Sequence, residues 1–261
     1  MTSPVPGARG ALRAAGRRAA HLARRARQGV AWGRDYAWIV RSQATAPARA
    51  LTARGLATGD RAPVVLLPGI YETWPVLSGL ARTLHAAGHP VHVVPALGLN
   101  RRPLDASAAL VGARMRALAL DGVVLVAHSK GGLVGKLVLA DPEVGHRVAG
   151  LVAVNTPFAG SVYARWFPAR SVRALSPVDP HVLALARDVA THARIWSVYA
   201  RFDPHVPAGS ELPGAVNVRL PLDGHFRVLD DPRLHAVVLD AVAALGDGAR
   251  GGTTADGPPP A

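Results

Sequence analysis

Cysteine is absent from the 261-residue chain. Its absence excludes disulfide bonds, thiolate metal sites and a cysteine nucleophile, although it leaves the cellular compartment open. The sequence also has no run of about eighteen apolar residues without a charge, which argues against a transmembrane helix. The N-terminal segment lacks the continuous apolar core of a secretory signal, so we expect no signal peptide. We therefore expect a cytoplasmic protein, with any membrane contact confined to its surface.

Acidic residues are scarce, and lysine is scarcer still. Thirty Lys and Arg residues face 17 Asp and Glu residues, for a formal net charge of +13, and only Lys130 and Lys136 are lysines. Residues 1–61 hold twelve Arg and two Asp, or +10, which leaves +3 for the other 200 residues. The net charge therefore describes a basic N-terminal arm and says little about the rest of the chain.

The arm, residues 1–61, is predicted to combine an Arg-rich segment with a linker. Apolar residues recur at helical spacing from Leu12 to Ala26, but most are alanine, so their burial yields little free energy. One interpretation is a solvated tail or a helix packed on the following domain. The other is a cationic helix that contacts an anionic membrane surface, with Trp32 and Trp38 at the interface. We expect no nucleic-acid binding, because aromatic residues are not interleaved with the arginines.

Short apolar runs alternate with helical segments from residue 62 to residue 245. The runs predict six strands, at residues 64–67, 91–94, 123–126, 148–154, 195–200 and 216–220. Helices are predicted near residues 77–84, 105–118, 131–140 and 232–245, with Asp105 as an N-cap. This alternation indicates an α/β domain with a mainly parallel sheet and helices on both of its faces.

Two segments depart from this alternation. Residues 156–194 are too long for one crossover, and they leave the carboxyl-terminal edge of the sheet, where ligands bind in open α/β folds. We interpret them as a lid-like insertion, in which Trp166 and Phe167 either contact substrate or bury themselves. Residues 246–261 are mostly Gly, Pro, Thr and Asp, and we expect a disordered tail.

The chemistry centres on Ser129, which follows a predicted strand and precedes a predicted helix. Ala127 and Gly131 lie two residues to either side, where only small residues fit because the two backbones nearly touch. This pattern predicts a nucleophile elbow that lifts the serine hydroxyl above the sheet. It also leaves the N–H of Lys130 at a helix N-terminus, where it can stabilise an oxyanion. The alternative is a tight structural turn in which the serine caps the helix.

Asp203 and His225 are the predicted partners of Ser129. Each follows a predicted strand, at the sheet edge where the elbow lies. Histidine can accept the serine proton and return it to the leaving group, and a carboxylate fixes the imidazole tautomer. The order Ser, Asp, His along the chain is that of the α/β-hydrolases. Six other residues compete for these roles and are given less weight, and the last two of them are expected to cap the final helix: His128, His205, Asp179, Asp223, Asp230 and Asp231.

A second oxyanion donor is expected in the loop that follows the first strand. Gly69 permits a tight turn there, which can aim the N–H of Ile70 at the elbow, with the N–H of Tyr71 as the fallback. Tyr71 is also a candidate for substrate contact. A bare strand-to-helix turn is the alternative.

These motifs resemble those of the α/β-hydrolase superfamily, and in particular its small bacterial lipases and esterases. The resemblance spans residues 62–245, and its carriers are Leu66-Leu-Pro-Gly-Ile70, Ala127-His-Ser-Lys-Gly-Gly132, Asn155-Thr-Pro-Phe-Ala-Gly-Ser161, Phe202-Asp-Pro-His-Val-Pro207 and Gly224-His225. Three features depart from the family: Pro68 replaces a common His, Lys130 replaces a common Met or Gln, and the usual two initial antiparallel strands have no counterpart.

The resemblance and the ordered residues together predict a serine hydrolase of carboxylic esters that acts through an acyl-enzyme. Its substrate would be a small-molecule or lipid ester. No cofactor or metal is expected, because no histidine pair combines metal-ligand spacing with a supporting carboxylate. Thioesterases and acyltransferases share the same residues, so they remain alternatives. A non-catalytic, membrane-peripheral module is the alternative of a different class. Nothing in the sequence indicates an oligomeric state.

Overall fold

A six-stranded, wholly parallel sheet lies at the centre of the computed structural model, which describes residues 6–50 and 53–251. The strand order is β2-β1-β3-β4-β5-β6. The strands are β1 (Val64–Leu67), β2 (Val91–Val93), β3 (Val123–His128), β4 (Val148–Val154), β5 (Ile195–Phe202) and β6 (Val216–Asp223). All six predicted strands are thus confirmed, and three of them run two or three residues beyond the predicted ends.

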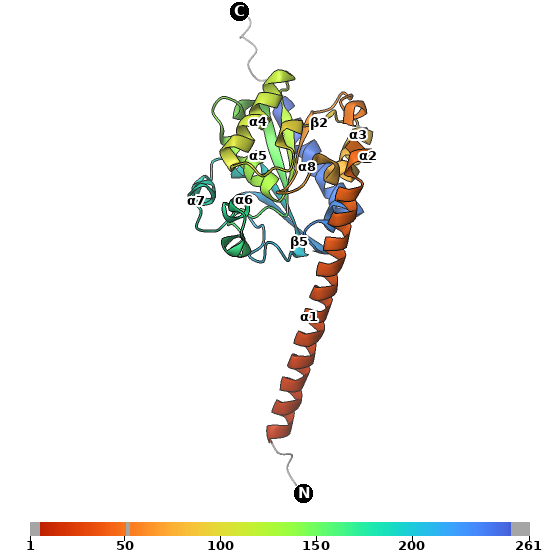
Figure 1. Ribbon diagram of the computed structural model, residues 1–261, viewed down its shortest axis with the longest axis vertical. Coiled ribbons are helices and arrows are strands. Elements are labelled where there is room, and N and C mark those ends of the chain that lie inside the picture. The colour runs from red at the N-terminus through yellow and green to blue at the C-terminus, as the bar shows by residue number, and fades with distance from the viewer. Residues whose placement is uncertain (1–5, 51–52, 252–261) are drawn as a thin grey trace, which may run out of the picture.

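Helices cover both faces of the sheet (Figure 1). α4 (Leu104–Ala117) and α5 (Lys130–Ala140) cover one face, and α3 (Ser78–Ala86) and α8 (Pro232–Gly251) cover the other. Successive strand residues point to opposite faces, so each face has its own apolar core. Val65 and Leu67 of β1 lie in the core under α4 and α5, while Val64 and Leu66 lie in the core under α3 and α8.

Two local predictions are corrected. Asp105 is not the N-cap of α4: Pro103 holds that position and Asp105 lies in the first turn. The predicted tail begins at residue 246, but α8 continues to Gly251. The rest of that predicted tail, residues 252–261, lies outside the described residues.

Short helices complete the described chain. The insertion contains η5 (Val162–Trp166), α6 (Arg170–Arg173), α7 (Pro180–Arg187) and η6 (His192–Arg194). The predicted linker contains α2 (Ala46–Ala50) and η1 (Ala53–Leu56). Single turns elsewhere are η2 (Trp74–Leu77), η3 (Pro95–Leu97), η4 (Gly145–Arg147) and η7 (Arg227–Asp230).

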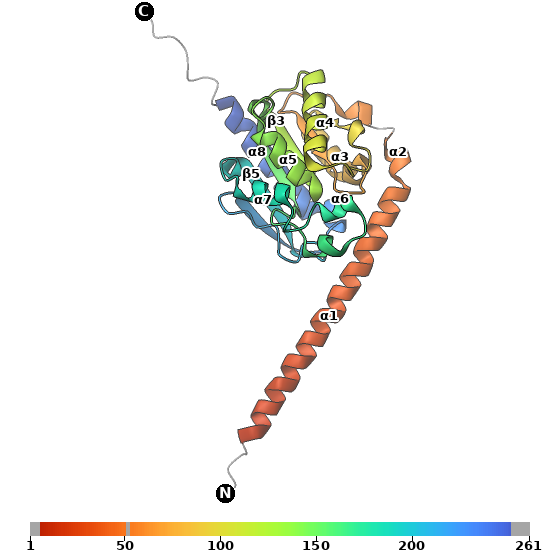
Figure 2. The same ribbon diagram turned by 60° about the vertical axis from the view of Figure 1, so that its left-hand side comes forward.

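The arm forms one long helix, α1 (Pro6–Ala44), with two different parts. Its N-terminal part projects away from the domain, and its C-terminal part runs alongside it (Figures 1 and 2). Trp38 and Ile39 pack against the core under α3 and α8, and the Trp38 Nε1 donates a 2.7 Å hydrogen bond to Asp230. The end of the arm is therefore integrated into the domain surface. No helix in the described part of the chain is both long and apolar enough to cross a membrane.

Gly131 lies where α5 passes the end of β1, and it provides a test of this packing. A Cβ at this position would lie 2.3 Å from the Leu67 carbonyl oxygen and 2.8 Å from that of Pro68. We expect Gly131→Ala to lower the free energy of unfolding by about 1–3 kcal/mol, measured by urea denaturation. Gly248→Ala is the matched control, since a Cβ there meets nothing within 4 Å. Equal stability of Gly131→Ala and wild type would contradict the close approach.

Candidate active site

Ser129 occupies a sharp turn between β3 and α5. Its backbone has φ 52° and ψ −122°, a combination that L residues rarely adopt. Its N–H continues the sheet ladder by donating to the Val154 carbonyl at 2.9 Å, and α5 begins at the next residue. The strain therefore arises because the chain must reverse at once from a buried strand into a helix.

Backbone strain is concentrated around this turn. Four of the five described non-glycine residues with positive φ lie in it or in the loops that meet it, namely Tyr71, Asn100, Ser129 and Asn155, and the fifth is Ala119. Strained conformations persist only where the surrounding contacts enforce them, and they cluster at functional sites. Asn100 illustrates the enforcement, because its Nδ2 donates to the Pro68 carbonyl at 2.7 Å.

The structure brings Ser129, His225 and Asp203 together in one hydrogen-bonded chain. The Ser129 Oγ lies 2.9 Å from the His225 Nε2, and the His225 Nδ1 lies 2.7 Å from the Asp203 Oδ2. All three residues are more than nine-tenths buried. The first distance is within the range that proton transfer from the hydroxyl to the imidazole requires, and the second is that of a hydrogen bond which can orient the ring.

Charge interactions between Asp203 and His225 favour the ionised form of this pair. Burial lowers the pKa of His225, but the charge and hydrogen bond of Asp203 outweigh it and hold that pKa above 6.5. Burial raises the pKa of Asp203, but His225 and the N–H groups of His205 and Val206 lower it below the usual 3.8. The carboxylate thus remains charged at neutral pH, where it can orient the imidazole and stabilise its protonated form.

The competing histidines have other contacts. His128 points away from the serine: its Nδ1 forms a buried ion pair with Glu72, at 2.8 Å, and its Nε2 donates to the His225 carbonyl at 3.0 Å. The ring of His205 stacks on Trp32 of α1, with ring centroids 5.8 Å apart. Burial, reinforced by the neighbouring His225, lowers the pKa of His205 to about 4, so this ring is neutral near pH 7.

The competing carboxylates are also engaged elsewhere. Asp223 forms an exposed bidentate ion pair with Arg201, and the Asp179 side chain caps α7 by accepting from the N–H groups of its first turn. Neither residue contacts the serine–histidine pair among the described interactions. Asp203 is therefore the carboxylate that the fold presents to His225.

Two backbone N–H groups near the serine have no acceptor in the described part of the chain, those of Ile70 and Lys130. The other three N–H groups of residues 69–72 have acceptors. The Gly69 N–H donates to the Glu72 carboxylate, the Glu72 N–H donates to the Gly69 carbonyl, and the Tyr71 N–H donates to the Leu99 carbonyl. The Lys130 amide opens α5, where helix geometry supplies no partner. The Tyr71 amide is consequently unavailable as the fallback donor.

The side chain of Lys130 braces the same region. It is 1% exposed, and its Nζ donates to the Asn100 carbonyl at 2.7 Å and to the Arg102 carbonyl at 2.5 Å. Lys136, the other lysine, is equally buried and ties α5 to the insertion through the Leu185 and Asp188 carbonyls. Burial lowers the pKa of each lysine to about 8.

The three residues considered for substrate contact lie at or near the surface. Trp166 is 82% exposed and Phe167 is 47% exposed, so neither is buried within the insertion. Tyr71 is 37% exposed, and its hydroxyl lies 3.2 Å from the Ser171 Oγ of α6, which links the loop after β1 to the insertion. The structure thus places Trp166 and Phe167 at the surface of the insertion, and substrate contact by these residues stays a prediction.

Sequence reasoning missed three buried polar residues that hold this site. Asn155 donates from Nδ2 to the His225 carbonyl at 3.0 Å, Glu72 anchors both Gly69 and His128, and Asp35 of α1 accepts the N–H of His225. Asp35 had a detectable signal, because it is the single acidic residue among residues 1–59. Within the described residues, no group of three or more His, Cys, Asp or Glu side chains could hold a metal ion.

Comparisons with solved structures identify the fold. No protein-family model and no curated protein sequence matches the chain. Lipase BlEst2 of Bacillus licheniformis, in its mature form, is 15% identical over 70% of this chain and 92% of its own, with a TM-score of 0.55. A carboxylesterase of the thaumarchaeon Nitrososphaera gargenis is 13% identical over 73% and 93%, with a TM-score of 0.56. A thermophilic esterase of Thermogutta terrifontis is 16% identical over 72% and 92%, with a TM-score of 0.53. The chain has the α/β-hydrolase fold, as predicted.

The buried Glu72 provides a test of how the site is held. We expect Glu72→Ala to lower the free energy of unfolding by about 3–5 kcal/mol, because the variant leaves the His128 ring and the Gly69 N–H buried without their acceptor. Chemical denaturation monitored by tryptophan fluorescence measures the change. Glu143→Ala is the control: Glu143 is exposed, and its loss should change stability by less than about 0.5 kcal/mol. Matching losses in the two variants would refute the anchoring role.

Proposed function

We propose that this protein is a serine hydrolase that cleaves carboxylic esters. The observation that carries the proposal is the chain of short hydrogen bonds from Ser129 through His225 to Asp203, next to two unpaired amides. Two of the structural neighbours described above are esterases and one is a lipase. A low-identity likeness supports the fold, so the assignment of activity depends on the site itself.

The geometry supports acyl transfer through a covalent intermediate. The Ser129 Oγ attacks the ester carbonyl while the His225 Nε2 accepts its proton, and the negative oxygen that forms is stabilised by the Ile70 and Lys130 amides. The protonated imidazole, stabilised by Asp203, then gives its proton to the departing alcohol. A water molecule, activated by the same imidazole, cleaves the acyl-serine ester and restores the enzyme. The reaction uses side chains and amides of this chain throughout.

Turnover of p-nitrophenyl esters from acetate to palmitate tests this proposal. We expect the wild-type protein to hydrolyse at least part of the series, and Ser129→Ala to lower kcat/KM by more than about a thousandfold, because no other nucleophile is activated. A parallel thioester series separates the closest alternative, since a strong preference for thioesters would reassign the protein as a thioesterase. No turnover of either series by the wild type would reject the hydrolase proposal.

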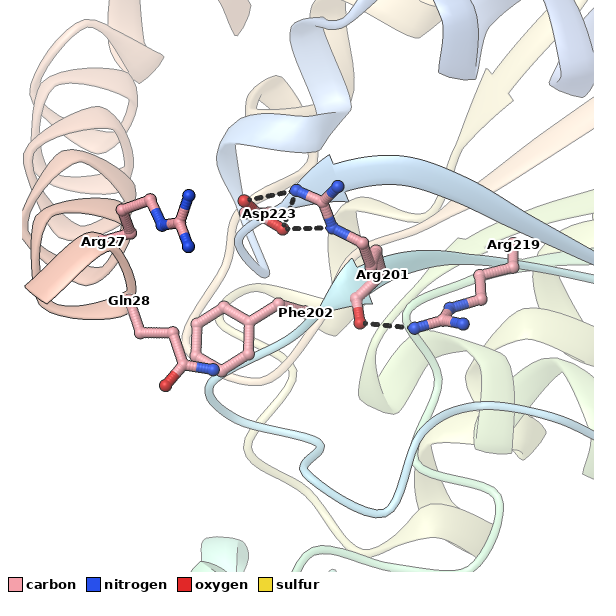
Figure 3. A pocket seen from close by; sticks show the side chains of 6 residues that line it. All are labelled: Arg27, Gln28, Arg201, Phe202, Arg219 and Asp223. Carbon is pink, nitrogen blue, oxygen red and sulfur yellow. Dashed lines mark hydrogen bonds and ion pairs between the residues drawn. The ribbon is translucent and has the colours of Figure 1, made fainter. Parts of the chain in front are cut away.

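We further propose that the projecting part of α1 binds an anionic lipid surface. Arg17, Arg18, Arg25 and Arg27 are exposed, and no acidic residue precedes Asp35 to neutralise them. Arg27 and Gln28 also face β5 and β6 across a cavity of about 450 Å³, where Arg219 adds positive charge and Arg201 is paired with Asp223 (Figure 3). Basic residues near an anionic bilayer contribute roughly 1 kcal/mol each. The exposed Leu22 adds apolar area to the same helix.

Co-sedimentation with phosphatidylglycerol vesicles tests this second proposal in the full chain. We expect replacement of Arg17, Arg18, Arg25 and Arg27 by glutamine to weaken vesicle binding at least tenfold. The matched control changes net charge equally on the domain, through glutamine at Arg61, Arg82, Arg116 and Arg187, which are all exposed. Equal weakening by both variants, or no binding by the wild type, would remove α1 from the account of membrane contact.

A further inference from the structure

The single acidic residue of the N-terminal arm is buried against the candidate catalytic histidine. Residues 1–59 contain eleven arginines and one carboxylate, Asp35. Solvation favours an exposed carboxylate, and a nearby arginine would be its usual partner. Asp35 instead has 0% exposure and forms none of the described ion pairs.

Three consecutive backbone N–H groups of the histidine loop donate to this carboxylate. The Asp35 Oδ2 accepts from His225 at 2.8 Å, and its Oδ1 accepts from Phe226 at 2.9 Å and from Arg227 at 2.8 Å. Gly224 has φ 123°, and a Cβ on it would lie only 2.7 Å from the Asp35 Oδ1. The loop thus wraps closely around a side chain that lies about 190 residues earlier in the sequence.

These contacts complete the support of His225. Its carbonyl accepts from the Asn155 Nδ2 and the His128 Nε2, its ring bonds Ser129 and Asp203, and Asp35 is the partner of its N–H. The same helix also reaches the loop after β1. The Gln43 Nε2 donates to the Tyr71 carbonyl at 2.6 Å, and its Oε1 accepts from Thr73 at 3.1 Å.

Asp35 and Gln43 are eight residues apart, which corresponds to about 12 Å along a helix. We propose that two residues of α1 are positioning residues of the candidate site: Asp35 positions His225, and Gln43 positions the loop that carries the Ile70 amide. This inference rests on the proposed hydrolase activity. It assigns to the arm a function that is separate from any contact of its projecting part with lipid.

The carboxylate also contributes charge. Burial has the largest effect on the pKa of His225 and lowers it. The negative groups around the ring raise this pKa: Asp203 has the largest such effect, followed by Glu72 and Asp35. The other titratable rings that face His225 are His128 and His205. Removal of the Asp35 charge should therefore lower the pKa of His225, and the acidic limb of the pH–rate profile should move to lower pH.

Asp35→Asn in the full-length protein is the test, because asparagine keeps the size but loses the charge and one acceptor. We expect kcat for a p-nitrophenyl ester to fall about 10- to 100-fold with KM changed less than about threefold, since small misplacements of catalytic groups have effects of this size. The acidic limb should shift to lower pH, whereas a merely structural loss would reduce the active fraction without moving it. Asp35→Glu should restore the limb position in part.

Val40→Ala is the matched control on the same helix, since Val40 is 66% exposed, and we expect wild-type kinetics from it. If Asp35→Asn does not fold, Gln43→Ala provides the test, with an expected loss of kcat and an unchanged acidic limb. Unchanged kcat and an unmoved limb in folded Asp35→Asn would overturn the inference while wild-type turnover still supports the hydrolase. If the wild type itself shows no turnover, NMR titration of His225 in the wild type and in Asp35→Asn tests the role of Asp35 separately. A lower His225 pKa in the variant would support this role, and an equal pKa would reject it.

Discussion

The candidate site depends on how one buried imidazole is held. His225 is 3% exposed, and its N–H, its carbonyl and both ring nitrogens each have a hydrogen-bond partner. A buried imidazole that must gain and lose a proton needs nearby negative charge, because its protonated form is otherwise destabilised by the loss of solvent. Asp203 supplies that charge directly, and the surrounding contacts prevent the ring from rotating away from Ser129. These partners lie between Asp35 and Asp203 in the sequence, so the site draws on segments that are far apart along the chain.

Lysine and glutamate are rare in this Arg-rich chain, and both types supply buried polar contacts. Both lysines are 1% exposed and bind backbone carbonyls, which suits a compact ammonium on a flexible stem better than a planar guanidinium. Of the three glutamates, only Glu72 is buried, and it links the loop after β1 to the strand that precedes the serine. The abundant arginines, in contrast, are mostly exposed. In a chain whose charged residues are mostly arginine, the few lysines and glutamates therefore indicate where buried polar contacts lie.

The sequence predicted the sheet well because each strand is a short apolar run bounded by turn residues. It also predicted that Ser129, Asp203 and His225 lie at one sheet edge, since all three follow strands that are parallel, and the structure places them within hydrogen-bond distance. Sequence reasoning offered a helix packed on the domain as one interpretation of the arm, but it could not identify the contacts of α1. The stripe that the helix offers is alanine-rich and yields little burial energy, and its polar contacts reach loops as far as 192 residues away. The exposure of Trp166 could not be predicted, because an aromatic residue in an insertion can be buried or exposed with the same local pattern.

The most direct test of the central claim is to locate the nucleophile. Incubation with a fluorophosphonate, followed by intact-mass measurement and peptide mapping, reports which side chain has been activated by a neighbouring base. The account predicts a single adduct on Ser129, formed at a rate that falls when His225 is replaced by alanine, because the imidazole is the group that removes the hydroxyl proton. No adduct, or an adduct at another residue, would contradict the account.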